Sequence, residues 1–181
     1  MTHDQMMRTP YDQIGEVPTF TLGSTDVKNG EELAPPQRSG IFGAGGTDTS
    51  PELHWSGFPA GTKSFAVTVF DPDAPTGSGW WHWVVFNLPP DTRTLLAGAG
   101  NPASGKLPKG AVQSLTDFGV PGYGGPCPPK SDRPHRYVFT VHALEVEKLD
   151  LDEKAMPAMV GFMITTNRID KATFTSTYSR K

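Results

Sequence analysis

Residues able to bind an anion or move a proton fall in three short segments of this chain. Each segment has backbone stiffened by proline or opened by glycine. They are Asp-Pro-Asp-Ala-Pro at 71–75, Trp-Trp-His-Trp at 80–83, and Tyr-Gly-Gly-Pro-Cys-Pro-Pro at 123–129, which runs on to His-Arg-Tyr at 135–137. If the fold brings these segments together, their carboxylates, imidazoles and phenol form one small preformed cup for a charged ligand.

The first segment carries two carboxylates, Asp71 and Asp73, on rigid backbone. Pro72 and Pro75 push the residues before them out of helical conformation. An isolated Asp-Pro-Asp is usually a turn in which the carboxylate accepts hydrogen bonds from loop amides. The segment therefore indicates a site only together with its neighbours.

Two histidines lie on expected strands. Alternation along a strand places His82 on one face and Trp81 and Trp83 on the other. His135 and Tyr137 share a face of a later strand, whose end therefore presents an imidazole beside a phenol. A buried polar cluster can also be purely structural, so these residues leave a binding site and a structural network as open alternatives.

The third segment supplies a rigid loop at 124–129. Its glycines let backbone N–H groups approach an anion, and its prolines fix the curve without donating. A turn without a ligand is the alternative. Cys127 is the single cysteine, and we expect an inert, small apolar residue rather than a reactive thiol.

The elements that must position these residues are mainly strands. The chain has 20 glycines and 18 prolines spread along its length, which favours many short strands joined by turns and long loops. Loops are expected at 30–51, anchored by Ile41 and Phe42, and at 91–129. In a C-terminal helix, Met159, Phe162 and Met163 share one face. The expected strands are 17–22, 53–55, 64–70, 81–88, 135–146 and 171–178, and the expected helix is 157–169.

Length and charge limit the remaining possibilities. The 181 residues fit an N-terminal arm at 1–16 and a single domain at 17–181. A net charge of -3 and a pI near 5.9 give no basic surface for nucleic acid. One cysteine excludes an intramolecular disulfide framework, and no metal or cofactor motif is present. The polar N-terminus and the absence of a long apolar stretch predict a soluble, cytoplasmic protein.

In order and spacing, the three segments resemble the phosphatidylethanolamine-binding protein family. That family includes the Raf kinase inhibitor protein and plant flowering-time regulators. The shared pattern is Asp-Pro-Asp-Ala-Pro, a Trp-x-His-Trp strand ending in Asn-Leu-Pro, Gly-Gly-Pro-Cys-Pro-Pro, and His-Arg-Tyr. The similarity runs from about residue 17 to about residue 144, and it is closest to the compact bacterial and archaeal members.

The resemblance implies a β-sandwich of two antiparallel-rich sheets with a C-terminal helix. It also implies a pocket at one end for phosphate-like or acetate-like groups and for the phosphatidylethanolamine headgroup. Two departures are the cysteine at Cys127, where some eukaryotic members have glycine, and the lack of their longer terminal helix. Carried over position by position, the ligand-binding residues are Asp71, Trp80, His82, Gly125, Pro126, Cys127, His135 and Tyr137, with Asp73 bracing the wall.

We expect a binding protein rather than an enzyme, because no activated nucleophile is evident. Its ligand would be a small anion, a phosphoethanolamine-type headgroup or a phosphorylated protein, and the last would permit regulation of a kinase. A weak hydrolase that uses an Asp–His acid–base pair and a protease-inhibitor or scaffold protein are the alternatives. A tryptophan-rich outward face of the strand at 81–88 would suit a homodimer, although burial against a second sheet explains those residues equally well.

Overall fold

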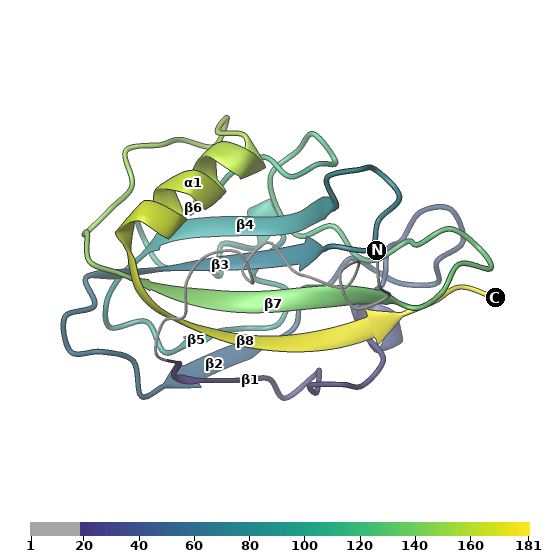
Figure 1. The fold of residues 1–181 in the computed structure, drawn as a ribbon, viewed down its shortest axis with the longest axis horizontal. Helices are drawn as coiled ribbons and strands as arrows, with labels where there is room; N and C mark the ends of the chain where they lie inside the picture. The colour runs from purple at the N-terminus through teal and green to yellow at the C-terminus, as the bar shows by residue number, and fades with distance from the viewer. Residues whose placement is uncertain (1–18) are drawn as a thin grey trace, which may run out of the picture.

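The computed structural model describes residues 19–181 as two stacked antiparallel sheets with one α-helix on the outer face of the larger sheet (Figure 1). The smaller sheet contains β1 (Thr21–Gly23), β2 (Leu53–Ser56) and β5 (Thr94–Leu95), in that order. The larger sheet contains, in spatial order, β6 (Val112–Gln113), β4 (Trp80–Leu88), β3 (Ser64–Asp71), β7 (His135–Leu144) and β8 (Arg168–Tyr178). The predicted β-sandwich is therefore confirmed.

Two hydrophobic layers hold the sandwich together. Every residue of β3 is buried, as expected for a run of β-branched and aromatic side chains at the centre of a sheet. Side chains such as Val67 and Phe139 face the smaller sheet, whereas Ala66 and Phe86 face the helix α1 (Pro157–Asn167). Burial on both faces makes the centre of this sheet a rigid support for its ends.

The helix differs from the expectation at its end and on its buried face. It stops at Asn167, and β8 follows without a loop. Val160 and Ile164 pack on the sheet, whereas Met159 and Phe162 are 52% and 62% exposed. The sheet-facing side is therefore set by the i, i+4 pair of β-branched residues. Met163 packs beside this pair, so it does not share a face with the exposed Met159 and Phe162 as predicted.

Strand β4 contains a β-bulge that breaks the predicted alternation. Val69 of β3 pairs with Trp83, but the next residue, Phe70, pairs with Trp81, so His82 is an extra residue in the ladder. A bulge re-aims the side chains around it. Trp83 lies between the two sheets and Trp81 packs beneath α1. The prediction that both tryptophans share a face opposite His82 is therefore wrong, and the strand has no tryptophan-rich outward face to favour a homodimer.

The long loops are largely as expected, with short regular pieces inside them. The segment at 30–51 contains the 3-10 turn η3 (Pro35–Gln37), and the segment at 91–129 contains η4 (Pro102–Ser104) together with β5 and β6. Ile41 and Phe42 do not anchor the first loop, because they are 49% and 80% exposed. Leu33 and Ala44 are the hydrophobic residues that are buried in this loop instead.

The N-terminal part of the chain is described only from residue 19. The predicted arm at 1–16 and the first two residues of the strand expected at 17–22 lie outside the described residues. Within residues 19–181, none of the helices has the length and apolar character needed to cross a membrane.

Candidate functional site

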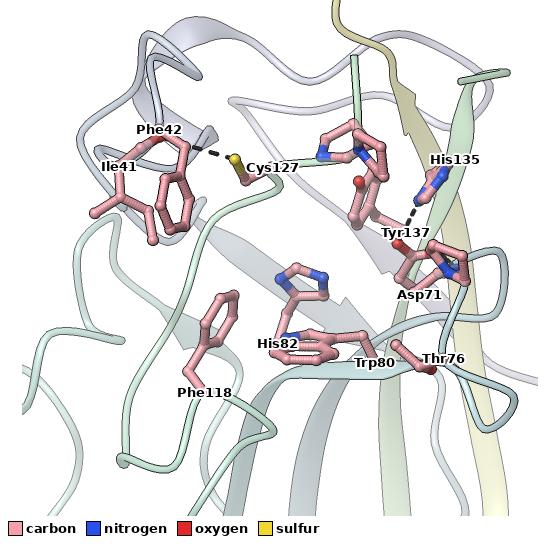
Figure 2. A pocket seen from close by; sticks show the side chains of 14 residues that line it. Ile41, Phe42, Asp71, Thr76, Trp80, His82, Phe118, Cys127, His135 and Tyr137 are labelled. Atoms are coloured by element: carbon pink, nitrogen blue, oxygen red, sulfur yellow. Dashed lines mark hydrogen bonds and ion pairs between the residues drawn. The ribbon is translucent and has the colours of Figure 1, made fainter. Parts of the chain in front are cut away.

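The sheet order β4-β3-β7 brings the three predicted segments to one end of the larger sheet. β3 ends at Asp71, β4 begins at Trp80 and β7 begins at His135, and antiparallel pairing places these ends side by side. They surround a cavity of about 250 Å³ (Figure 2). Six of the nine residues predicted for the site line it: Asp71, Trp80, His82, Cys127, His135 and Tyr137.

His135 is held between two carboxylates. Its Nδ1 donates to Asp71 Oδ2 at 2.8 Å and its Nε2 donates to Asp132 Oδ2 at 3.0 Å. Asp71 Oδ1 accepts the backbone N–H groups of Asp73 and Ala74 at 2.8 and 3.1 Å. Because ionised carboxylates only accept hydrogen bonds, both ring nitrogens carry a proton and the ring is an imidazolium.

The protonation of His135 results from competition between burial and charge. Burial by itself lowers the pKa of this ring, but the hydrogen bonds and charges of Asp71 and Asp132 outweigh it and raise the pKa above the ordinary value. The bond from His135 lowers the pKa of Asp132 in turn. The two carboxylates therefore compensate the His135 imidazolium, which offers no unpaired positive charge to the cavity.

The second histidine is in the opposite state. His82 Nδ1 lies 2.7 Å from the carbonyl oxygen of Gly124, which can only accept, so Nδ1 carries a proton. Burial lowers the pKa of His82 and favours the neutral ring, so Nε2 has a free lone pair. Figure 2 shows the ring turned into the cavity, where it packs edge-on against Tyr137 with ring centroids 5.3 Å apart.

Two buried polar groups at the cavity lack a partner. The Tyr137 hydroxyl and the Trp80 indole N–H make no hydrogen bond within the described part of the chain, although both atoms are buried. Burial raises the pKa of Tyr137, so its hydroxyl stays protonated and able to donate. Because an unpaired buried donor costs about 1–3 kcal/mol, such groups at a cavity indicate a place for a ligand.

Asp73 lies beside the site but does not line the cavity. Its carboxylate accepts Arg136 Nε and the Arg136 backbone N–H, both at 2.9 Å, and Arg133 at 3.0 Å. Burial raises the pKa of Asp73, but the bonds from Arg136 outweigh it and lower the pKa. Asp73 therefore fixes the turn after β3 to the start of β7.

Gly125 and Pro126 do not line the cavity either. The Gly124 N–H donates to the His82 carbonyl at 2.9 Å, and the Gly125 N–H donates to Asp48 Oδ1 at 2.8 Å. The glycines in the sequence suggested amides that could bind an anion. These two amides are not free to do so, because each already donates a hydrogen bond within the protein. Instead, they hold the loop in place and set the position of the Gly124 carbonyl that orients His82.

The rim of the cavity is apolar, and sequence reasoning missed it. Ile41 and Phe42 lie at the mouth with exposed side chains, and Phe118 forms one wall. The Phe118 ring packs edge-on against Trp80 and His82, with centroids 5.3 and 5.4 Å apart. The cavity therefore combines a polar interior with an entrance suited to carbon atoms.

A residue near the C-terminus joins the two loops that form this rim. The guanidinium of Arg180 donates to the carbonyl oxygen of Phe42 from one nitrogen. A second nitrogen lies 3.3 Å from the carbonyl oxygen of Pro128 and 3.4 Å from Cys127 Sγ. Cys127 Sγ is itself 3.8 Å from the carbonyl oxygen of Ile41, so Cys127 is a contact of the rim as well as of the cavity.

Most of this chain matches one known protein family. The family model described as phosphatidylethanolamine-binding protein matches residues 23–179. The chain belongs to the phosphatidylethanolamine-binding protein family. The resemblance inferred from the three segments is therefore confirmed. The match covers the strands from β2 to β8, the helix and every residue that lines the cavity.

Bacterial members of the phosphatidylethanolamine-binding protein family are similar over most of their length. The UPF0098 protein YbcL of Escherichia coli is 51% identical over 162 residues, which cover 90% of this chain and 88% of YbcL. The UPF0098 protein YbhB of the same organism is 51% identical over 160 residues, 87% of this chain and 99% of YbhB. The expected similarity to compact bacterial members is thus confirmed.

Solved structures show the same family fold. The crystal structure of E. coli YbcL, described as a new member of the mammalian PEBP family, superposes with a TM-score of 0.88 and covers 91% of this chain and all of that one. A putative homologue from Chlamydia trachomatis is 30% identical with a TM-score of 0.75, and the match covers 90% of this chain and 99% of that one.

Proposed function

We propose that this protein binds a small ligand through a phosphoryl or carboxylate group that enters the cavity between His82 and Tyr137. The observation that carries the proposal is the buried Tyr137 hydroxyl, which has no partner within the described residues. A ligand oxygen would give this donor an acceptor, and the Trp80 indole N–H is a second donor of the same kind. The hydrogen bonds would then be made at binding rather than within the fold.

The size of the cavity limits what can enter. Its volume of about 250 Å³ equals about eight water molecules at ~30 Å³ each. This space suits a phosphoryl group with a few attached atoms and excludes acyl chains. The ligand class is therefore a headgroup of the phosphoethanolamine type, a free small anion or a phosphorylated side chain. Where such a ligand continues outside the cavity, its carbon atoms would contact the apolar rim.

An ethanolamine ammonium would lie against an aromatic ring rather than at Asp71. Both Asp71 oxygens already accept hydrogen bonds, two from backbone amides and one from His135. The rings of Trp80 and Phe118 line the same cavity, and an aromatic face attracts a cation. A headgroup could thus place its phosphoryl group near Tyr137 and its ammonium group at this wall.

Binding without turnover agrees with the state of His135. Both of its nitrogens are engaged by carboxylates, so neither is available to accept a proton from a substrate. The alternative of a weak hydrolase that uses Asp71 and His135 as its acid–base pair would need one of these bonds to break first. Regulation of a kinase through a phosphorylated side chain is a further consequence that we propose for the same cavity.

An NMR titration tests this function. Inorganic phosphate, acetate and phosphoethanolamine should each shift the signals of His82, Tyr137 and Cys127, whereas ethanolamine alone should shift them less. Residues of α1, such as Phe162, provide an internal control because they are exposed and outside the cavity. Saturable shifts confined to other surfaces, or none at millimolar ligand, would contradict the proposal.

A further inference from the structure

The cavity contains no net positive charge to attract an anion. The His135 imidazolium is flanked by Asp71 and Asp132 at 2.8 and 3.0 Å, so its charge is already compensated by carboxylates. The other groups with unpaired polar atoms, Tyr137 and Trp80, are uncharged donors. An anion that enters such a site therefore gains little from the charge of His135, and a further group that becomes positive would favour its binding.

His82 is the group that can supply this charge. Its Nδ1–H is committed to the Gly124 carbonyl at 2.7 Å, so a proton can be added only at Nε2. In the neutral ring Nε2 is an acceptor, which would repel the oxygen of a fully ionised ligand. Once protonated, Nε2 becomes a donor directed into the cavity beside Tyr137 (Figure 2).

We infer that anion binding at this cavity is coupled to the uptake of one proton by His82. The inference rests on the proposed function, since it specifies the charge state in which the ligand is held. The proton comes from solvent and forms a bond to Nε2 through its lone pair. The Nδ1–H group keeps its hydrogen bond to the carbonyl oxygen of Gly124. An O–H bond of a solvent hydronium ion breaks in this step, and no covalent bond of the protein or of the sulfate-type ligand changes. A ligand that carries its own proton, such as hydrogen phosphate, can instead keep that proton and donate a hydrogen bond from its O–H group to the neutral Nε2.

The charged groups around His82 favour the neutral ring in the free protein and proton uptake on anion binding. Burial lowers the pKa of the free ring, and the charge of His135 acts in the same direction. The Gly124 carbonyl and the charges of Asp71 and Asp117 act in the opposite direction. An anion placed at Nε2 would add to the interactions that favour the charged ring, and it would therefore raise the pKa of His82 in the complex.

Sulfate is the probe that isolates the effect, because it carries no proton near neutral pH. Sulfate affinity should be measured by NMR titration of the full chain between pH 5.5 and 7.5. Above the pKa of the free His82 ring, the apparent Kd should rise about tenfold per pH unit, as uptake of one proton requires. In side-chain nitrogen spectra, free His82 should show the Nδ1–H tautomer, and the sulfate complex should show both nitrogens protonated.

His82→Gln provides the matched test, since its amide can donate into the cavity but does not titrate. In this variant sulfate should bind with a nearly flat pH profile, whereas His54→Gln, on the exposed part of β2, should keep the wild-type slope. If the glutamine variant does not fold, the tautomer measurement on the wild-type protein decides the question.

The outcomes separate this inference from the proposed function. Sulfate binding in the cavity with a pH-independent Kd, or a slope that persists in His82→Gln, would overturn the proton coupling and leave anion binding intact. Absence of binding by sulfate, phosphate and acetate at every pH would overturn both. A tenfold slope that the His82 substitution removes would support the inference.

Discussion

Replacing Asp71 with asparagine should show how much stability comes from the buried carboxylate on one side of His135, as distinct from Asp132 on the other side. Asp71→Asn keeps an oxygen for the amides of Asp73 and Ala74, which Asp71 Oδ1 accepts. It places an NH₂ group, which donates rather than accepts, opposite His135 Nδ1. The side chains of Asp71 and His135 are 4% and 1% exposed, so solvent cannot replace the lost charge.

Loss of one partner of such a buried, charge-assisted bond costs about 2–4 kcal/mol of unfolding free energy. With an m-value of about 2 kcal/mol/M, the urea midpoint should fall by roughly 1–2 M. The pKa of His135 is raised in the folded protein, so this stabilisation is present below the ring's unfolded-state pKa. It is lost as the pH rises through the folded-state pKa. The difference between wild type and variant should thus be largest near pH 6 and smaller at pH 9.

Asp132→Asn is the matched control on the other side of the same ring. The Asp132 side chain is 37% exposed, so water can solvate the freed imidazole edge and the loss of stability should be much smaller. Urea unfolding of both variants, followed by tryptophan fluorescence at pH 6, compares them directly. Equal losses, or an unchanged midpoint in Asp71→Asn, would refute the assignment of His135 as a buried imidazolium.

Further substitutions test three other parts of the structure: the cavity, its rim and the helix α1. Tyr137→Phe should leave the thermal midpoint unchanged or slightly raised, because it removes an unpaired buried hydroxyl. It should weaken phosphate binding by about 5- to 30-fold in the NMR titration, and unchanged affinity would argue against hydroxyl contact. Arg180→Gln should accelerate amide hydrogen exchange in both rim loops, with Lys181→Gln as the control that leaves exchange unaltered. Ile164→Val should cost about 1 kcal/mol in urea unfolding and Phe162→Gln less than ~0.5, and the reverse order would contradict the buried face of α1.

The strands and the three segments that meet at the cavity could be predicted because each rests on a local pattern. The buried run of β3 follows from residue type. The alternation predicted from His135 to Tyr137 and on along β7 is confirmed, because that strand pairs regularly over this stretch. Its inward-facing residues lie in the core between the sheets. The three proline- and glycine-rich segments converge because consecutive antiparallel strands place their ends together.

The bulge at His82 could not be predicted from alternation alone. An extra residue in one strand is visible only against the register of its partner, here the shift between Val69 and Phe70. The bulge is what lets Trp81 pack beneath the helix while Trp83 lies between the sheets. Each strand alone gives no sign of this difference.

The hydrogen-bond partners of the site also depend on tertiary structure. The Gly125 amide donates to Asp48, 77 residues earlier in the chain, so glycine in the sequence did not mean a free amide. Asp132 is different, because its position three residues before His135 could have indicated a partner for that ring. The rim contact between Arg180 and Phe42 joins residues 138 apart and left no local signal.

The central claim is that the cavity beside Tyr137 holds an anion, and a crystal soaked with selenate tests it most directly. Selenium gives an anomalous signal that distinguishes the ion from water. The account predicts an anomalous peak in the cavity, with ion oxygens within hydrogen-bond distance of the Tyr137 hydroxyl and His82 Nε2. Selenate bound at other sites while this cavity contains only water, at a pH of about 5.5, would contradict the account.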